Sequence, residues 1–181
     1  MWKGRFKGVS HLFVWKDTSS ESTEYPAKCA PWIDELSQWA LGQIDYPWQS
    51  LGTSIKFVSW HRGRRRKWHG LAFLADNRIE IYPRSWDKPI EVAHTVAHEI
   101  GHIVDWIFLT DEDRSHWRRV RGFSQDYPWY GSRLRPDWKD PSGDFAECFA
   151  AWQVPGVSAR TSRPVTAAIL DLVSDLAGKR R

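Results

Sequence analysis

The sequence predicts an α+β fold, in which a small, twisted, mostly antiparallel sheet packs on one long helix and further helices follow toward the C-terminus. Short runs of apolar or alternating residues, typical of strands, occupy the first half of the chain. Segments with helical periodicity and capping residues follow from about residue 85. With 181 residues and 41% hydrophobic content, the chain is expected to form one domain over 1–181.

The first half carries several strand patterns and one helix pattern. Pro31 suits the first turn of a helix with one apolar face. Asp76-Asn77 separates two short apolar runs, which is typical of a hairpin. The expected elements are a strand at 9–16, a mobile polar loop at 17–26, a helix at 31–42, a strand at 55–60, and hairpin strands at 71–75 and 78–82.

An apolar stretch from Val92 to Leu109 predicts a long central helix. Ser85 or Asp87 lies at its entry, and Pro89 suits its first turn. Thr110 is then expected to cap a helix at 111–119, whose acids come first and arginines last, as the helix dipole favours. The remaining expectations are an irregular loop at 126–141, a helix capped by Ser142 or Asp140 that runs to about Gln153, a helix opened by Ser162 and Pro164 that runs to about Leu176, and a basic tail at 177–181.

The central helix carries the pattern His98-Glu99-Ile100-Gly101-His102. Residues four apart in a helix lie on one face, about 6 Å apart along the axis, so the two imidazoles can bind one ion. This HExxH pattern is typical of zinc sites in which the glutamate acts as general base on a metal-bound water. We therefore expect Zn²⁺ on His98 and His102, with Glu99 as the catalytic base.

A buried helix could also carry two hydrogen-bonded histidines without any metal. The apolar flanks favour the metal interpretation, because buried ionisable side chains cost free energy unless they are paired or metal-bound. Gly101 lowers helix propensity by about 1 kcal/mol relative to alanine. A glycine at that position indicates close approach of another backbone.

A catalytic zinc needs a third protein ligand, and Asp144 and Glu147, three apart on one expected helix face, are the candidates. Residues 146–150 read AECFA, some forty residues after HExxH. This pair of motifs resembles that of the gluzincin metallopeptidases, particularly lethal-factor-like domains and the prenyl-protein peptidases. The resemblance covers about 71–151, and it implies a zincin-like fold and hydrolysis of peptide bonds.

In those families the helix reads E-x-x-A-[DE]-x-F-A, with the first glutamate on zinc and the later acid orienting a histidine. The resemblance therefore implies that Glu147 orients a histidine, but Gly143 stands where the zinc ligand should be. Three interpretations stay open. Asp144 binds zinc from the next position, which we favour; Glu147 moves inward and binds it; or the site is not an active peptidase.

The resemblance also implies a tyrosine, in a Tyr-Gly pair, that donates a hydrogen bond to the oxyanion of the reaction, and Tyr130-Gly131 matches that pair. A loop aromatic that packs on neighbouring tryptophans is the alternative. His94 is expected in the core or at its rim, since it is too far along the helix to share an ion with both motif histidines. Asp105 is expected either to hold His102 through its other ring nitrogen or to pair with an arginine.

The chain is mildly basic, with a formal net charge of +4. Its local pattern matters more, because residues 61–69 read HRGRRRKWH. Such a run could contact nucleic-acid phosphates weakly, and a solvated loop is the equal alternative. The cations concerned are Arg62, Arg64, Arg65, Arg66 and Lys67.

Cys29 and Cys148 form no CxxC motif, so free thiols are expected, with one disulfide as the alternative. No stretch approaches the 18 or so apolar residues needed to cross a bilayer, and no signal peptide is recognised. We therefore expect a cytoplasmic protein without membrane contact, while secretion by another route stays open.

Together these patterns predict a zinc metalloendopeptidase that acts on a protein or peptide substrate. The resemblance implies that the edge strand of the hairpin holds the substrate in an extended form. Two other classes remain as alternatives. One is a nucleic-acid-associated basic protein that uses 61–69, and the other is a catalytically inactive interaction module stabilised by metal.

Overall fold

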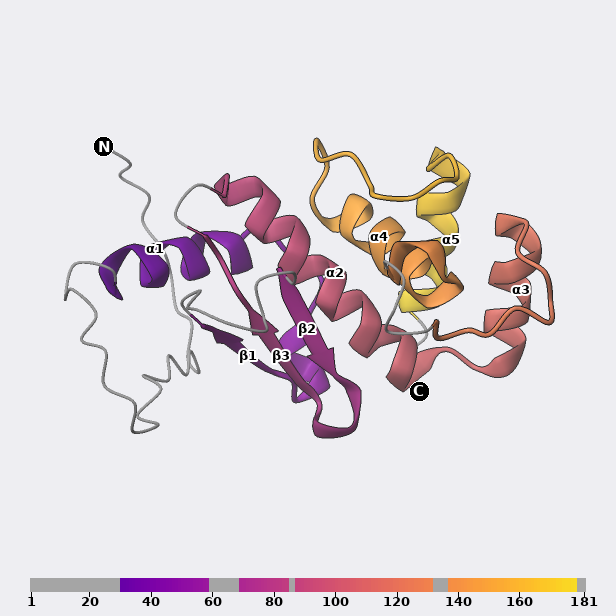
Figure 1. Cartoon of the computed structure of the whole chain (residues 1–181), viewed down its shortest axis with the longest axis horizontal. Coiled ribbons are helices and arrows are strands. Elements are labelled where there is room, and N and C mark those ends of the chain that lie inside the picture. The colour runs from indigo at the N-terminus through magenta and orange to yellow at the C-terminus, as the bar shows by residue number, and fades with distance from the viewer. Residues whose placement is uncertain (1–29, 59–68, 85–86, 132–136, 179–181) are drawn as a thin grey trace.

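In the computed structural model, residues 30–58, 69–84, 87–131 and 137–178 are described. The predicted strand at 9–16, the loop at 17–26 and nearly all of the basic run lie outside them. Figure 1 shows one helix, α2 (Pro89–Phe108), running diagonally through the middle of the molecule, with α1 (Ala30–Leu41) and the sheet on one side of it. On the other side lie α3 (Asp111–Arg121), α4 (Pro141–Gln153) and α5 (Ala167–Ala177). The α+β class is confirmed.

The sheet is mixed rather than mostly antiparallel, which corrects the prediction. Its strands are β1 (Ser54–Phe57), β2 (Gly70–Phe73) and β3 (Arg78–Ile81), in the order β1-β3-β2. β2 and β3 form the predicted antiparallel hairpin, and β3 then lies between β2 and β1, where it pairs parallel to β1. A hairpin pattern fixes only the β2–β3 pairing, because the neighbour on the other side of β3 is chosen by non-local packing.

The turn of the hairpin is longer than the two-residue turn expected from Asp76-Asn77. A short 3₁₀ turn at Leu74–Asp76 comes first, and Asn77 then adopts the left-handed conformation with φ 46°. Asparagine tolerates this conformation better than most side chains do. Its side chain is also fixed, since Thr53 donates to the Asn77 Oδ1 at 2.7 Å and Asn77 Nδ2 donates to the Leu51 carbonyl at 2.8 Å.

α2 is the core helix of the molecule, and its sequence explains its length. Pro89 occupies its first turn, and an almost unbroken run from Val92 to Asp105 is buried. Gly101 lies where α4 crosses: a Cβ on this glycine would stand 2.9 Å from the Cα of Ala146, closer than packed atoms approach. The predicted close approach of a second backbone at Gly101 is therefore confirmed.

The helices after α2 follow the predicted order, with one shifted start. Thr110 caps α3 in a reciprocal arrangement with Asp113, in which each side chain accepts from the other's backbone N–H. The last helix begins at Ala167, not near Pro164, and the Pro164 carbonyl instead accepts a hydrogen bond from Arg121 at 2.5 Å. Its C-terminal Ala177 is buried, so the tail starts later than predicted.

The hydrophobic core gathers around α2 and α4. Trp117 of α3 is fully buried there and meets Phe145 edge to face, with ring centroids 5.2 Å apart. Cys148 is a buried free thiol in this core, which agrees with the prediction for that cysteine. Within the described residues, none of the helices is both long and apolar enough to span a membrane.

Candidate metal centre

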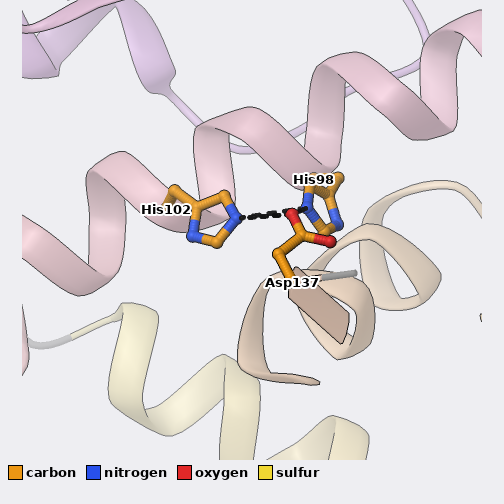
Figure 2. Close-up of side chains that lie close together, drawn as sticks. All are labelled: His98, His102 and Asp137. Atoms are coloured by element: carbon orange, nitrogen blue, oxygen red, sulfur yellow. Dashed lines mark hydrogen bonds and ion pairs between the residues drawn. The ribbon is translucent and has the colours of Figure 1, made fainter. Parts of the chain in front are cut away.

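The two motif histidines and one aspartate converge on a common point. His98 Nε2 lies 3.1 Å from His102 Nε2 and 3.1 Å from Asp137 Oδ2. The same Asp137 oxygen lies 3.5 Å from His102 Nε2. Figure 2 shows both imidazoles projecting from one face of α2 and the carboxylate of Asp137 reaching them from the neighbouring turn. Among the described residues, these three form the one group of side chains suited to hold a metal ion.

The spacing of these three atoms fits a zinc ion. Two ligands that each lie about 2.0 to 2.1 Å from a tetrahedral ion are about 3.3 Å apart. The three separations here, between 3.1 and 3.5 Å, scatter around that value. Two imidazoles and one carboxylate are also a ligand set that catalytic zinc uses, with the fourth position left for water.

The site is open on one side. His98 and His102 expose 8% and 13% of their side chains, whereas Asp137 exposes 52%. The histidines are therefore fixed by their surroundings, and a molecule arriving from solvent could approach on the side of Asp137.

Asp137 was not among the predicted ligands, and its position explains the glycine that interrupted the pattern. It begins a short 3₁₀ turn, η3 (Asp137–Lys139), that precedes α4. A Cβ on Gly143 would overlap the backbone carbonyl of Asp137. Gly143 thus lets this turn lie directly on α4, so the carboxylate enters the site from the turn before the helix instead of from the helix itself.

Asp144, the favoured third ligand, lies elsewhere. It is fully buried, and its two oxygens accept from Arg121 Nε and Nη2 at 2.7 and 2.8 Å. Thr161 donates to the same carboxylate. This two-point ion pair uses the acceptor capacity of Asp144, and the structure does not bring it into the histidine cluster. The structure therefore does not place the favoured third ligand beside the histidines, and the carboxylate that lies there is Asp137.

Glu147 lies behind the first histidine. Its Oε1 is 3.1 Å from His98 Nδ1, on the opposite side of the ring from Asp137, while its Oε2 accepts from the backbone N–H of Arg160 at 2.7 Å. A carboxylate on the far nitrogen fixes the tautomer and orientation of a metal-binding imidazole and raises its basicity. The position of Glu147 matches the orienting role that the sequence resemblance implied, and not the alternative of a direct ligand.

His94 stands one turn before His98 and is buried, as predicted. Its Nε2 lies 3.8 Å from Glu147 Oε2, so Glu147 lies between two histidines of α2. Burial lowers the pKa of His94 to about 4, against the partial opposing effect of Glu147. His94 is therefore neutral at pH 7, so the negative charge of Glu147 interacts mainly with His98.

The charges around His98 favour a cation in the cluster. Burial would lower the pKa of His98, but its contacts with Asp137 and Glu147 outweigh burial and raise that pKa well above its usual value. Burial would likewise raise the pKa of Asp137, yet its hydrogen bonds with His102 and His98 hold it well below the usual range. Two ionised carboxylates flanking one imidazole create a site for positive charge, which a divalent cation would satisfy.

Glu99 lies on the side of α2 that faces the sheet. It is buried, and it accepts a hydrogen bond from the backbone N–H of Ala72. Burial raises the pKa of Glu99, while the nearby His98 and His102 partly offset that rise. A carboxylate with a raised pKa, held beside the histidine pair, has the properties of a general base.

Tyr130 lies beside the C-terminal part of α2, where Arg114 donates to its hydroxyl at 3.2 Å. Its ring packs against Trp106, with centroids 6.3 Å apart. Burial and the nearby Asp105 raise the pKa of the Tyr130 phenol. The hydroxyl thus keeps its proton, but in this structure it is engaged by Arg114, so the oxyanion role of Tyr130 stays a prediction.

Asp105 takes the second of its two predicted roles. Its carboxylate accepts from Arg114 Nε at 3.1 Å and from Trp129 Nε1 at 2.7 Å. The pairing with arginine is confirmed. These bonds tie the chain segment that carries Tyr130 to α2, next to the metal cluster.

Comparison with protein-family models, with curated proteins and with solved structures found no match, so the function is argued from the site itself.

Proposed function

We propose that this protein is a zinc-dependent peptidase with a zincin-like arrangement, in which His98, His102 and Asp137 bind the metal. The observation that carries the proposal is the spacing of their three donor atoms, 3.1 to 3.5 Å, beside the buried carboxylate of Glu99. A zinc site that only stabilised the fold would close all four positions around the ion with protein ligands. Such a site would need no further buried carboxylate like that of Glu99 beside it.

The chain's own residues divide the work of hydrolysis. When bound, zinc would lower the pKa of a coordinated water and polarise the scissile carbonyl. Glu99 would accept the proton of the attacking water and deliver it to the leaving amine. Glu147, whose Oε1 lies 3.1 Å from His98 Nδ1, would orient this ring so that its Nε2 faces the cluster. Asp137 adds the negative charge that keeps a divalent ion in an open site.

The substrate class follows from the sheet. Among the described strands, β2 lies at the edge of the sheet and alongside α2, so an extended peptide could pair with that edge and present a bond to the cluster. A protein or peptide is therefore the proposed substrate.

Cleavage of a casein or peptide-library substrate by the zinc-loaded protein, compared with Glu99→Gln, tests the proposal. We expect the wild type to cleave and Glu99→Gln to lose at least 100-fold in kcat while it binds zinc with unchanged stoichiometry, because the amide cannot accept the proton. Stoichiometric zinc with no Glu99-dependent cleavage would contradict the proposal and favour a metal-stabilised interaction module.

A further inference from the structure

The edge of β2 that faces away from β3 lies next to Glu99, and the pairing of the hairpin shows which backbone groups it presents. Tyr82 donates its backbone N–H to the His69 carbonyl, so in this antiparallel pair residues 69, 71 and 73 direct their polar groups toward β3. The alternate residues, Gly70 and Ala72, direct theirs to the opposite side. No other strand of the described part of the chain lies on that side of β2.

Both of these residues meet the side chain of Glu99. The N–H of Ala72 donates to the Glu99 carboxylate. A Cβ on Gly70 would stand 2.7 Å from Glu99 Oε1 and 2.8 Å from its Cγ, which is closer than unbonded atoms approach. The carboxylate therefore occupies the space that any other residue at position 70 would fill with its own side chain.

We propose that Gly70 and Ala72 are positioning residues that set where the Glu99 carboxylate stands. Gly70 provides the room, and Ala72 provides the hydrogen bond that holds the carboxylate there. The inference deepens the proposed function and rests on it, since Glu99 is the general base of that function. It is independent of the metal ligands, because neither β2 residue belongs to the metal cluster.

The physical reason is that proton transfer depends steeply on geometry. A displacement of about 1 Å at a reacting group can lower the rate about 100-fold. Glu99 has a long side chain with several rotatable bonds, so α2 alone does not fix the place of its carboxylate. The strand supplies the missing constraint through rigid backbone rather than through another mobile side chain.

The first test compares kcat and KM of zinc-loaded variants on one peptide substrate. Gly70→Ala adds only the clashing methyl, and we expect kcat to fall about 100-fold, with KM changed less than threefold and one zinc per chain retained. Ala72→Pro removes the N–H at an edge that needs none for the ladder, whereas Ala72→Ser keeps it. Ala72→Pro should lose at least tenfold in kcat, and Ala72→Ser should stay within threefold of wild type.

The second test needs no activity. Thermal unfolding is measured for wild type, Gly70→Ala, Glu99→Ala and the double variant. If the methyl and the carboxylate compete for one space, Gly70→Ala lowers Tm by several degrees with Glu99 present and by much less once Glu99 is alanine. Equal losses in both backgrounds would overturn the placement of Glu99 against Gly70.

These outcomes distinguish the positioning role of Gly70 and Ala72 from the proposed function itself. Normal kcat in Gly70→Ala and Ala72→Pro, with Glu99→Gln inactive, would overturn the positioning role and leave the proposed function intact. Absence of Glu99-dependent cleavage in the wild type would overturn the proposed function and the positioning role with it, while the unfolding cycle would still decide whether the two side chains share one space.

Discussion

At the scale of single residues, the site depends on a glycine as much as on its ligands. Asp137 can reach the histidines because Gly143 has no side chain where η3 lies on α4. In the proposed site, Gly143 and Asp137 therefore act as a pair, because the missing side chain on α4 makes room for the turn that carries the carboxylate.

Gly143→Ala tests this pairing. The added methyl would overlap the Asp137 backbone, so η3 must move away and carry its carboxylate out of the cluster. We expect zinc affinity to fall at least tenfold, as measured by competition with a chromophoric chelator. Ala151→Ser, a half-buried position on the same helix, is the control and should bind as wild type does. Unchanged affinity in Gly143→Ala would contradict the role given to Gly143.

Asp144 is expected to matter for stability and not for metal. Replacing it with alanine leaves the buried Arg121 guanidinium without its carboxylate partner. Breaking such a pair from one side typically costs about 3 to 5 kcal/mol. Urea unfolding should show a loss of that order in Asp144→Ala, whereas the double change Asp144→Ala with Arg121→Met should recover part of it. A single variant as stable as wild type would refute the account of this pair.

At the scale of elements, α2 contributes residues both to the hydrophobic core and to the proposed metal site. Glu99 on α2 lies against Gly70 of the sheet. His98 and His102 project from α2 toward Asp137 of η3. His94 sits one turn earlier and is buried as a neutral ring. α2 therefore carries both the residues of the candidate site and a buried histidine, His94, whose protonation would lower the stability of the fold.

The pH dependence of stability should reflect His94. Its pKa is about 4 in the folded protein and 6.5 is its usual value, so between those pH values the unfolded chain binds the extra proton. Stability from this group is complete above pH 6.5 and falls as the pH drops toward 4, by roughly 3 kcal/mol.

The comparison to make is wild type against His94→Leu, with unfolding free energies measured after chelation at pH 7 and pH 4.5. The loss on acidification should be smaller in His94→Leu, even if that variant is less stable at pH 7. An equal or larger loss would show that His94 is not the group responsible.

The same elements show what the sequence could predict. Periodicity and caps located α1, α2, α3 and α4 closely, because apolar faces, Pro89 and Thr110 act locally. The order of strands and the late start of α5 depend on contacts far apart in the chain, such as the bond from Arg121 to Pro164. Local patterns carry no information on such contacts.

In the candidate site, too, some residues could be predicted from local spacing and others could not. His98, Glu99 and His102 share one helix, so their spacing alone placed them together. Glu147 was placed by its motif. Asp137 lies in an irregular segment, and the sequence indicated it only indirectly, through a glycine where a ligand was expected.

At the scale of the whole molecule, the hydrophobic core shields the thiol of Cys148 from solvent. Cys148 is buried on α4, and burial with the neighbouring Asp144 raises the pKa of its thiol to about 12. The thiol is therefore protonated and inaccessible near neutral pH, and its reaction with a thiol reagent should report global opening.

In a Cys29→Ser variant, which leaves Cys148 as the one cysteine of the chain, Ellman's reagent at pH 8 should react on the timescale of unfolding and at once in guanidinium chloride. The matched Cys148→Ser protein indicates how fast the other thiol reacts. Immediate reaction of native Cys148 would contradict its burial in the core.

A metal in the proposed site would also connect α2 to the segment before α4, because the proposed ligands come from both. A ligand that binds only the folded chain raises its stability in proportion to the logarithm of its concentration over Kd. Thermal unfolding should therefore shift to higher temperature with added zinc in the wild type, and markedly less so in Asp137→Asn.

The most direct test of the central claim is a zinc titration of wild type, Asp137→Asn and Asp144→Asn against a competing chelator. We expect one zinc per wild-type chain, affinity at least tenfold weaker in Asp137→Asn, and wild-type affinity in folded Asp144→Asn. Wild-type affinity in Asp137→Asn, or loss of zinc in Asp144→Asn alone, would contradict it.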